Sequence, residues 1–170
     1  MDPEYGSRIY EALRDERVRA VTYVPDIILE PIIRRFEEDG ESLVAKVGRE
    51  EEGVGVAAGL WLGGRRSALM LQSSGLGNSL NALGSFAAAY QIPLLLVVSP
   101  RGGVGEFNPA QVPFGRVFED VLGLIGVQCI TLRSGDGVQT AVSEACRTAF
   151  GASQSVALIL SRDLTGGKDE

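Results

Sequence analysis

Short, uniformly apolar runs alternate along the chain with longer segments in which apolar residues recur every three or four positions. The apolar runs have the length of strands and cover residues 20–24, 43–47, 68–72, 93–98, 127–132 and 155–160. The helical spacing covers residues 7–18, 27–39, 50–63, 79–91, 113–126 and 137–150. Strands that are apolar throughout are buried on both faces, so the pattern predicts an α/β fold: a six-stranded parallel sheet with helices on both faces. We expect a single domain over residues 1–170.

Unusual polar residues follow three of these predicted strands. The segments are 48-GREEEG-53, 73-SSGLGN-78 and 99-SPRGGVGEFNPAQ-111. In doubly wound sheets ligands bind outside the carboxyl ends of the strands, so we predict a site along this edge. We interpret residues 73–78 as a loop that places Asn78 at the N-cap of the next helix, and residues 99–111 as a long functional loop.

The composition narrows the classes of partner and of chemistry. The net charge of −6 and the pI of about 4.8 indicate no basic surface for nucleic acid or an anionic membrane. The chain has no histidine, which excludes Ser-His and Cys-His nucleophile systems. Cys129 and Cys146 lie in apolar segments, and we expect buried, reduced thiols. The sequence shows neither a signal peptide nor an apolar run of membrane-spanning length, so we expect a cytoplasmic protein.

The stretch 49-REEEGVGVAAG-59 places three carboxylates before a helix with few side chains. Glu51 and Glu52 suit the first turn of a helix, where the macrodipole favours negative charge. Glu50 lies nearest the strand end, and we expect it to face the ligand crevice. The glycines at 53, 55 and 59 lower the stability of the helix. Their presence would be explained by tight packing on the sheet, or by close approach of the helix to a ligand or a partner helix. Their spacing and acidic flank do not fit a dinucleotide-binding loop.

The other two strand ends each have two interpretations. The backbone amides of 73–78 form either an ordinary turn or an anion site at a helix start. Arg101 is either a surface arginine or a forked hydrogen-bond donor to a sulfonate, phosphonate or carboxylate.

Three segments together, 49-REEEGVGVAAG-59, 72-QSSGLGNSLNAL-83 and 101-RGGVGEFNPAQVPFGR-116, resemble the α subunits of sulfopyruvate decarboxylases. The chain is also similar to the N-terminal domain of phosphonopyruvate decarboxylases, including the segment 24-VPDIILEPII-33. Both groups are thiamine diphosphate-dependent decarboxylases. The resemblance extends from about residue 5 to about residue 160 and implies a pyrimidine-binding domain.

The resemblance also implies roles for individual residues. Relatives carry a Glu nine positions before a Gly in a small-residue helix, and counting back from Gly59 selects Glu50 as the catalytic carboxylate. It would hydrogen-bond the pyrimidine ring of thiamine diphosphate and favour the imino tautomer, while the cofactor supplies the electron sink. The implied cofactor-binding residues are Glu50, Pro25, Ser74, Gly75 and Asn78, and the implied substrate-binding residues are Arg101 and Gln111.

By the same resemblance the chain is half of an enzyme. In relatives a GDG motif followed by an Asn holds Mg²⁺ and the diphosphate. Here no Asn follows 135-GDG-137, since the last one is Asn108, and we interpret this tripeptide as a turn that caps the next helix. We therefore expect the diphosphate-binding domain and its Mg²⁺ on a separate β subunit, in a hetero-oligomer with paired α chains.

The choice of substrate depends on a comparison between the two groups of relatives. The sequence PAQVP at 109–113 lacks the His that phosphonopyruvate relatives carry there. This favours sulfopyruvate as substrate, giving sulfoacetaldehyde and CO₂ in coenzyme M or sulfonate metabolism. Phosphonopyruvate or another 3-substituted pyruvate stays open as the substrate. Two other classes also stay open: a non-catalytic regulatory or assembly subunit, and an unrelated small-ligand α/β domain.

Overall fold

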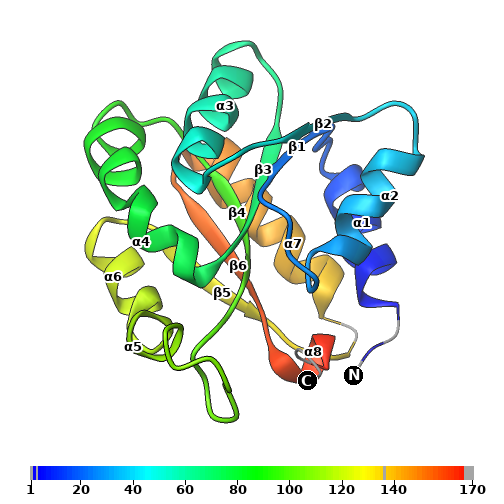
Figure 1. Cartoon of the computed structure of the whole chain (residues 1–170). Helices are drawn as coiled ribbons and strands as arrows, with labels where there is room; N and C mark the ends of the chain where they lie inside the picture. Colours follow the sequence, from blue (N-terminus) through cyan, green and yellow to red (C-terminus); the bar gives the residue numbers. More distant parts are fainter. Residues whose placement is uncertain (1, 3, 136, 167–170) are drawn as a thin grey trace.

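The computed structural model of the chain describes residues 2, 4–135 and 137–166, which fold around one six-stranded sheet (Figure 1). The strands are β1 (Ala20–Tyr23), β2 (Leu43–Lys46), β3 (Ser67–Gln72), β4 (Leu95–Ser99), β5 (Gln128–Leu132) and β6 (Val156–Leu160). They lie in the order β2-β1-β3-β4-β6-β5, and every neighbouring pair is parallel.

Helices cover both faces of this sheet. They are α1 (Tyr5–Asp15), α2 (Glu30–Glu38), α3 (Glu50–Leu62), α4 (Ser73–Asn81), α5 (Val112–Gly115), α6 (Phe118–Leu124), α7 (Val138–Cys146) and α8 (Arg162–Thr165), with π-helical segments η1 (Ala82–Ala88) and η2 (Arg147–Gly151). Side chains of α1, α2 and α7 share one core cluster, and side chains of α3, α4 and α6 share a second. The predicted fold class is therefore confirmed.

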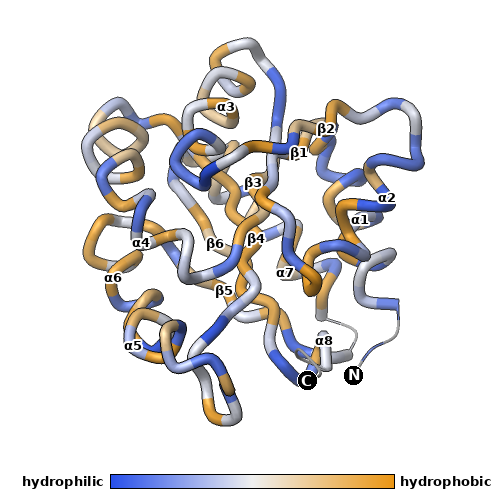
Figure 2. Tube along the Cα trace, viewed as in Figure 1, coloured by the Kyte–Doolittle hydropathy of each residue, from blue (hydrophilic) through white to orange (hydrophobic). Residues whose placement is uncertain are grey.

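The strands β4 and β6 show why the apolar runs are continuous. Leu95 and Val97 pack into the core under α1, α2 and α7, whereas Leu96 and Val98 pack into the core under α3, α4 and α6. All residues of β4 and β6 are buried, while the edge strands β2 and β5 keep exposed positions. Figure 2 shows the same contrast between the hydrophobic centre of the sheet and the hydrophilic connection from α2 to β2.

The prediction of a loop at residues 73–78 is wrong. α4 begins at Ser73, directly after β3, and Asn78 lies inside this helix rather than at its N-cap. The two glycines that suggested a turn are packing positions instead, since Gly75 lies against Glu50 and Gly77 faces the ring of Phe114. A glycine costs helical stability, but the missing Cβ lets neighbouring groups approach the helix backbone.

Other predicted helices differ at their ends. Residues 27–29 form a turn, and α2 begins at Glu30 with Pro31 in its first turn, where the missing N–H breaks no helical bond. The helix predicted for 113–126 is divided into α5 and α6 at Arg116 and Val117. The helix predicted for 79–91 is the end of α4 continued by η1.

Two features of the remaining chain bear on the predictions. Within the part of the chain that the structure describes, no helix is long and apolar enough to cross a membrane. Gly137 is the N-cap of α7, but Asp136 lies outside the described residues. The interpretation of 135-GDG-137 as a capping turn therefore stays a prediction.

Candidate functional site

The strand order brings the predicted strand ends together at one edge. The chain passes from β1 to β2 in one direction and from β3 to β4 in the other, so the topological switch lies between β1 and β3. Asp26 follows β1, Glu50 follows β2, Ser73 follows β3 and Arg101 follows β4. In open parallel sheets the crevice outside such a switch is the usual ligand site.

Glu50 is the first residue of α3, and its partly buried carboxylate lies against the first turn of α4. A Cβ added at Gly75 would overlap the carboxyl carbon and Oε1 of Glu50, so only glycine at this position leaves room for the carboxylate. No described residue donates a hydrogen bond to this carboxylate or forms an ion pair with it. Glu50 is therefore held by packing, and both of its oxygens stay able to accept a hydrogen bond from a ligand.

The other two carboxylates of this turn have partners within the turn. Glu51 forms an ion pair with Arg49, with Oε1 2.9 Å from Nε. Oε2 of Glu52 accepts a hydrogen bond from the backbone N–H of Gly48 at 2.9 Å, which stabilises the start of α3. The expectation that Glu51 and Glu52 are helix-start charges agrees with these contacts.

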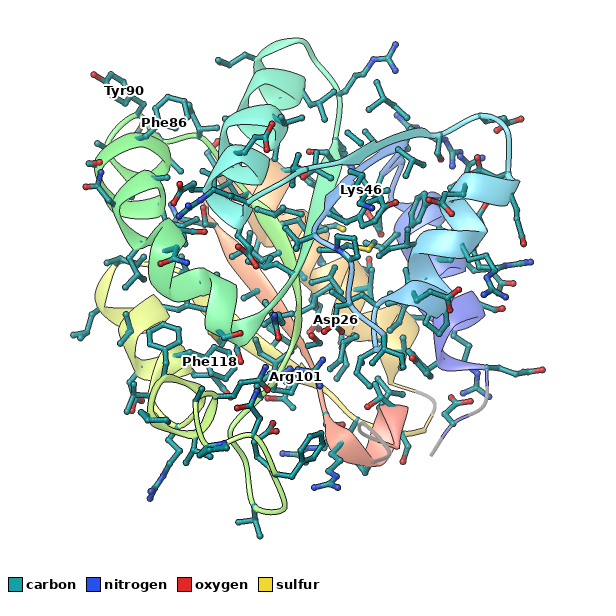
Figure 3. All side chains as sticks on the ribbon, viewed as in Figure 1. Asp26, Lys46, Phe86, Tyr90, Arg101 and Phe118 are labelled. Atoms are coloured by element: carbon teal, nitrogen blue, oxygen red, sulfur yellow. The ribbon has the colours of Figure 1, made fainter. Side chains whose placement is uncertain are left out.

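Arg101 is not a surface residue. Its side chain is 7% exposed and donates through Nη2 to the carboxylate of Asp26, whose side chain is 5% exposed (Figure 3). Its backbone N–H donates to Oγ of Ser73 at 2.9 Å. Asp26 also accepts the N–H of Ile28 through Oδ1 at 2.9 Å. The alternative of a solvent-exposed arginine is therefore wrong, and the arginine is already paired with a carboxylate of its own chain.

The remaining predicted site residues lie around this edge at different depths. Nε2 of Gln111 lies 3.4 Å from Oε1 of Gln72, which joins the loop after β4 to the end of β3. Pro25 lines a groove of about 460 Å³ together with Tyr23, Glu30 and Lys46. Ser74 is partly buried, whereas Asn78, one helical turn further along α4, is exposed.

Sequence reasoning missed Asp26 and Ser73 as members of this cluster. Asp26 appeared in the sequence only within the segment 24-VPDIILEPII-33, and Ser73 only as part of a predicted loop. The signal that selects Glu50, a polar residue shortly after a predicted strand, applies equally to both. Ser73 already lies in one of the three segments selected from the sequence, and applying the same signal to β1 would have added Asp26.

The two cysteines are protonated thiols, and the acidic side chains form no metal-binding group among the described residues. Both cysteines are free thiols, with Cys146 buried and Cys129 partly buried. Burial raises the pKa of Cys129 to about 11 and the pKa of Cys146 to about 12, so neither is a thiolate near neutral pH. The described residues contain no group of three or more His, Cys, Asp or Glu side chains arranged to hold a metal ion.

A solved structure with the same fold is a chain of the 2-oxoglutarate:ferredoxin oxidoreductase from Magnetococcus marinus. It superposes with a TM-score of 0.78 over 95% of this chain and 29% of that chain, at 12% identity. At this identity the likeness shows the fold alone. No family model matches the chain.

Curated relatives carry the family assignment. The chain is 36% identical over 152 residues to the sulfopyruvate decarboxylase subunit alpha of Methanococcus maripaludis, covering 89% of this chain and 91% of the relative. It is 35% identical over 160 residues to the same subunit of Methanothermobacter thermautotrophicus, covering 94% and 97%. A phosphonopyruvate decarboxylase of Streptomyces hygroscopicus is 35% identical over 134 residues, covering 78% of this chain and 33% of the relative. The chain therefore belongs to the family of sulfopyruvate decarboxylase α subunits.

Proposed function

We propose that the chain is the pyrimidine-binding half of a thiamine diphosphate-dependent decarboxylase that converts sulfopyruvate to sulfoacetaldehyde and CO₂. The bond between the carboxylate and the keto carbon breaks, and a proton takes the place of CO₂ on that carbon. The observation that carries the proposal is the carboxylate of Glu50. It is partly buried at the switch-point edge, seated on Gly75 and without a partner among the described residues.

The residues at this edge fit the pyrimidine end of the cofactor. A carboxylate with free acceptor capacity is what a protonated ring nitrogen requires, and the glycine beneath it leaves room for the carboxylate itself. Glu50 would hold this nitrogen, with Pro25, Ser74, Gly75 and Asn78 as the proposed contacts around it. Among these residues Asn78 is exposed and lies a full helical turn beyond Ser74. When bound, thiamine diphosphate supplies the electron sink for the departing carboxylate.

The rest of the site belongs, in this proposal, to a partner. The two relatives of which this chain covers more than nine-tenths are each named subunit alpha. We place the diphosphate-binding domain and its Mg²⁺ on a separate β subunit, and residues 1–170 form a single pyrimidine-binding domain. The complete site would lie between unlike chains in a hetero-oligomer with paired α chains.

The test is the variant Glu50→Gln in the complex of the chain with its β subunit, supplied with thiamine diphosphate and Mg²⁺. Glutamine keeps the size of the side chain but removes the charge that favours the protonated ring. We expect kcat to fall at least a hundredfold, as for other losses of proton-transfer catalysis. Glu51→Gln is the matched control, because Glu51 lies in the same turn but pairs with Arg49, and it should keep kcat within about twofold.

The same assay separates the competing functions. Turnover of sulfopyruvate that Glu50→Gln abolishes supports the proposal. Turnover of phosphonopyruvate alone would keep the mechanism and change the substrate. Full turnover by Glu50→Gln would exclude the catalytic role and favour a regulatory or assembly subunit.

A further inference from the structure

A cavity of about 240 Å³ lies beneath the loop that follows β4, outside the contact between Glu50 and Gly75. Its lining includes Arg101, residues 102–106, Phe118, Leu160 and Arg162. Figure 3 shows Arg101 at the base of this loop and Phe118 on the side of α6. A water molecule takes about 30 Å³ of liquid volume, so the cavity has room for a small organic acid.

Donor groups of this cavity are left without partners. Nε of Arg101 is buried, and no described residue accepts a hydrogen bond from it. The backbone N–H groups of Gly103, Val104 and Gly105 also donate to no described residue, but these three residues are exposed, so water reaches their N–H groups. A buried donor without an acceptor costs folding free energy, which an oxygen-rich ligand would recover.

A second guanidinium lies on the wall of the cavity. Nη1 of Arg162 donates to the carbonyl oxygen of Val104 at 2.9 Å. A Cβ added at Gly105 would lie 2.5 Å from this Nη1, so the arginine packs directly on the loop backbone. The positive φ angles of Gly102 (79°) and Gly105 (89°) produce a loop shape that side chains would disfavour.

The carboxylates on the lining are largely engaged elsewhere. Glu106 accepts the backbone N–H groups of Gly102 at 3.2 Å and Asn108 at 3.0 Å, which holds the loop in its closed shape. Glu119 is exposed to solvent. The cavity therefore offers Nε of Arg101, whose Nη2 is paired with Asp26, together with the guanidinium of Arg162, and such charged donors suit an oxyanion.

We infer that this cavity is the subsite for the sulfonate group of the substrate. The inference rests on the proposed function and deepens it. The backbone N–H of Arg101 donates to Ser73 at the start of α4, and Gly75 two residues later lies against Glu50, so the loop that lines the cavity is joined to the helix that contacts the carboxylate. The sulfonate end of a three-carbon substrate enters the cavity, while its keto end stays on the side of Glu50. A free inorganic oxyanion has the same chemistry and is the alternative source.

The test uses Arg162→Gln in the complex with the β subunit, because Arg162 is exposed and its loss leaves the buried ion pair intact. We expect KM for sulfopyruvate to rise about tenfold, as for the loss of one charged hydrogen bond, with turnover of pyruvate unchanged. Arg133→Gln is the matched control, since Arg133 is an exposed arginine that pairs weakly with Asp163 at 4.0 Å and does not line the cavity. Equal losses with sulfopyruvate and pyruvate, or the same effect in the control, would overturn the inference.

A second measurement does not depend on decarboxylation. The complex is titrated with isethionate, a small sulfonate, and separately with inorganic sulfate, while the unfolding temperature is recorded. Isethionate should stabilise the wild type, compete with sulfopyruvate and lose its effect in Arg162→Gln. If sulfate stabilises the complex without competing with sulfopyruvate, the cavity is a separate anion site and not a substrate subsite. If neither anion stabilises the wild type, the cavity is not an anion site. If isethionate stabilises a complex that has no decarboxylase activity, the cavity is still a sulfonate site and only the proposed function is contradicted.

Discussion

At the scale of single residues, the site depends on one missing methyl group. Glu50 occupies the volume that a side chain at position 75 would fill, so glycine at 75 and glutamate at 50 are a matched pair. The pair joins the start of α3 to the start of α4, and these helices follow different strands of the sheet. A carboxylate placed in this way is oriented by packing rather than by hydrogen bonds, which leaves its acceptor sites for a ligand.

The variant Gly75→Ala tests this pairing. Because the overlapping atoms belong to a flexible side chain, Glu50 moves aside at small cost, and alanine favours the helix by about 1 kcal/mol. We expect a fall in kcat of about tenfold or more, with little change in the free energy of unfolding. Gly77→Ala is the control in the same helix, since a Cβ there would meet Phe114 at an ordinary 3.6 Å. Unchanged kcat in Gly75→Ala, measured in the complex, would show that Glu50 has no fixed position.

At the scale of elements, the glycines of α3 have two different environments. A Cβ added at Gly53 would lie 2.5 Å from Cδ1 of Leu69 on β3, so this glycine allows α3 to pack tightly on the sheet. Gly55 and Gly59 face open space in which an added Cβ would meet no described atom within 4 Å. Tight packing on the sheet therefore explains the first glycine but neither of the others.

Alanine at these positions should change stability in opposite directions. Gly53→Ala forces a methyl group into a filled core and should lower the free energy of unfolding by about 1–3 kcal/mol. Gly55→Ala adds a better helix former at an exposed position and should raise it by about 0.5–1 kcal/mol. Urea unfolding of the purified protein measures both values. A destabilising Gly55→Ala would mean that this face of α3 is covered in the folded protein.

At the scale of the whole molecule, one carboxylate joins the first two helices to the edge of the sheet. Asp39 at the end of α2 accepts hydrogen bonds from Ser42 through its N–H (2.8 Å) and hydroxyl (2.7 Å), from the N–H of Glu41 (2.9 Å) and from the hydroxyl of Tyr10 on α1 (3.0 Å). Arg14 on α1 lies 3.1 Å from it. Burial alone would raise the pKa of Asp39, but these hydrogen bonds outweigh it and lower the pKa to about 2.

The lowered pKa makes part of the stability depend on pH. The folded-state pKa lies below the ordinary value of 3.8, so the contribution of Asp39 is complete above about pH 4 and is lost as the pH falls towards 2. We expect Asp39→Asn to be less stable than the wild type by about 1–2 kcal/mol at pH 7, with the difference shrinking between pH 4 and 2. Unfolding curves across this range measure it, with the exposed Asp120→Asn as control. A difference that stays constant down to pH 2 would contradict the assignment.

The number of strands, their alternation with helices and the edge that carries the polar residues were predictable from the sequence. These features depend on local periodicity: the run 93–98 is apolar because both faces of β4 are buried, and no distant residue is needed to recognise it. Glu50 could be singled out in the same way, because its place after a strand is a local property and the family resemblance points to the same residue.

Contacts between segments far apart in the chain were decided only by the tertiary structure. The sequence pattern did not predict the strand order β2-β1-β3-β4-β6-β5, which places Asp26 beside Arg101, 75 residues later, and makes a buried ion pair of two residues that taken alone suit the surface. The same packing makes Gly75 and Gly77 helical, although their local preference is for a turn. Glycine permits several conformations, and only the neighbours brought up by the fold select one of them.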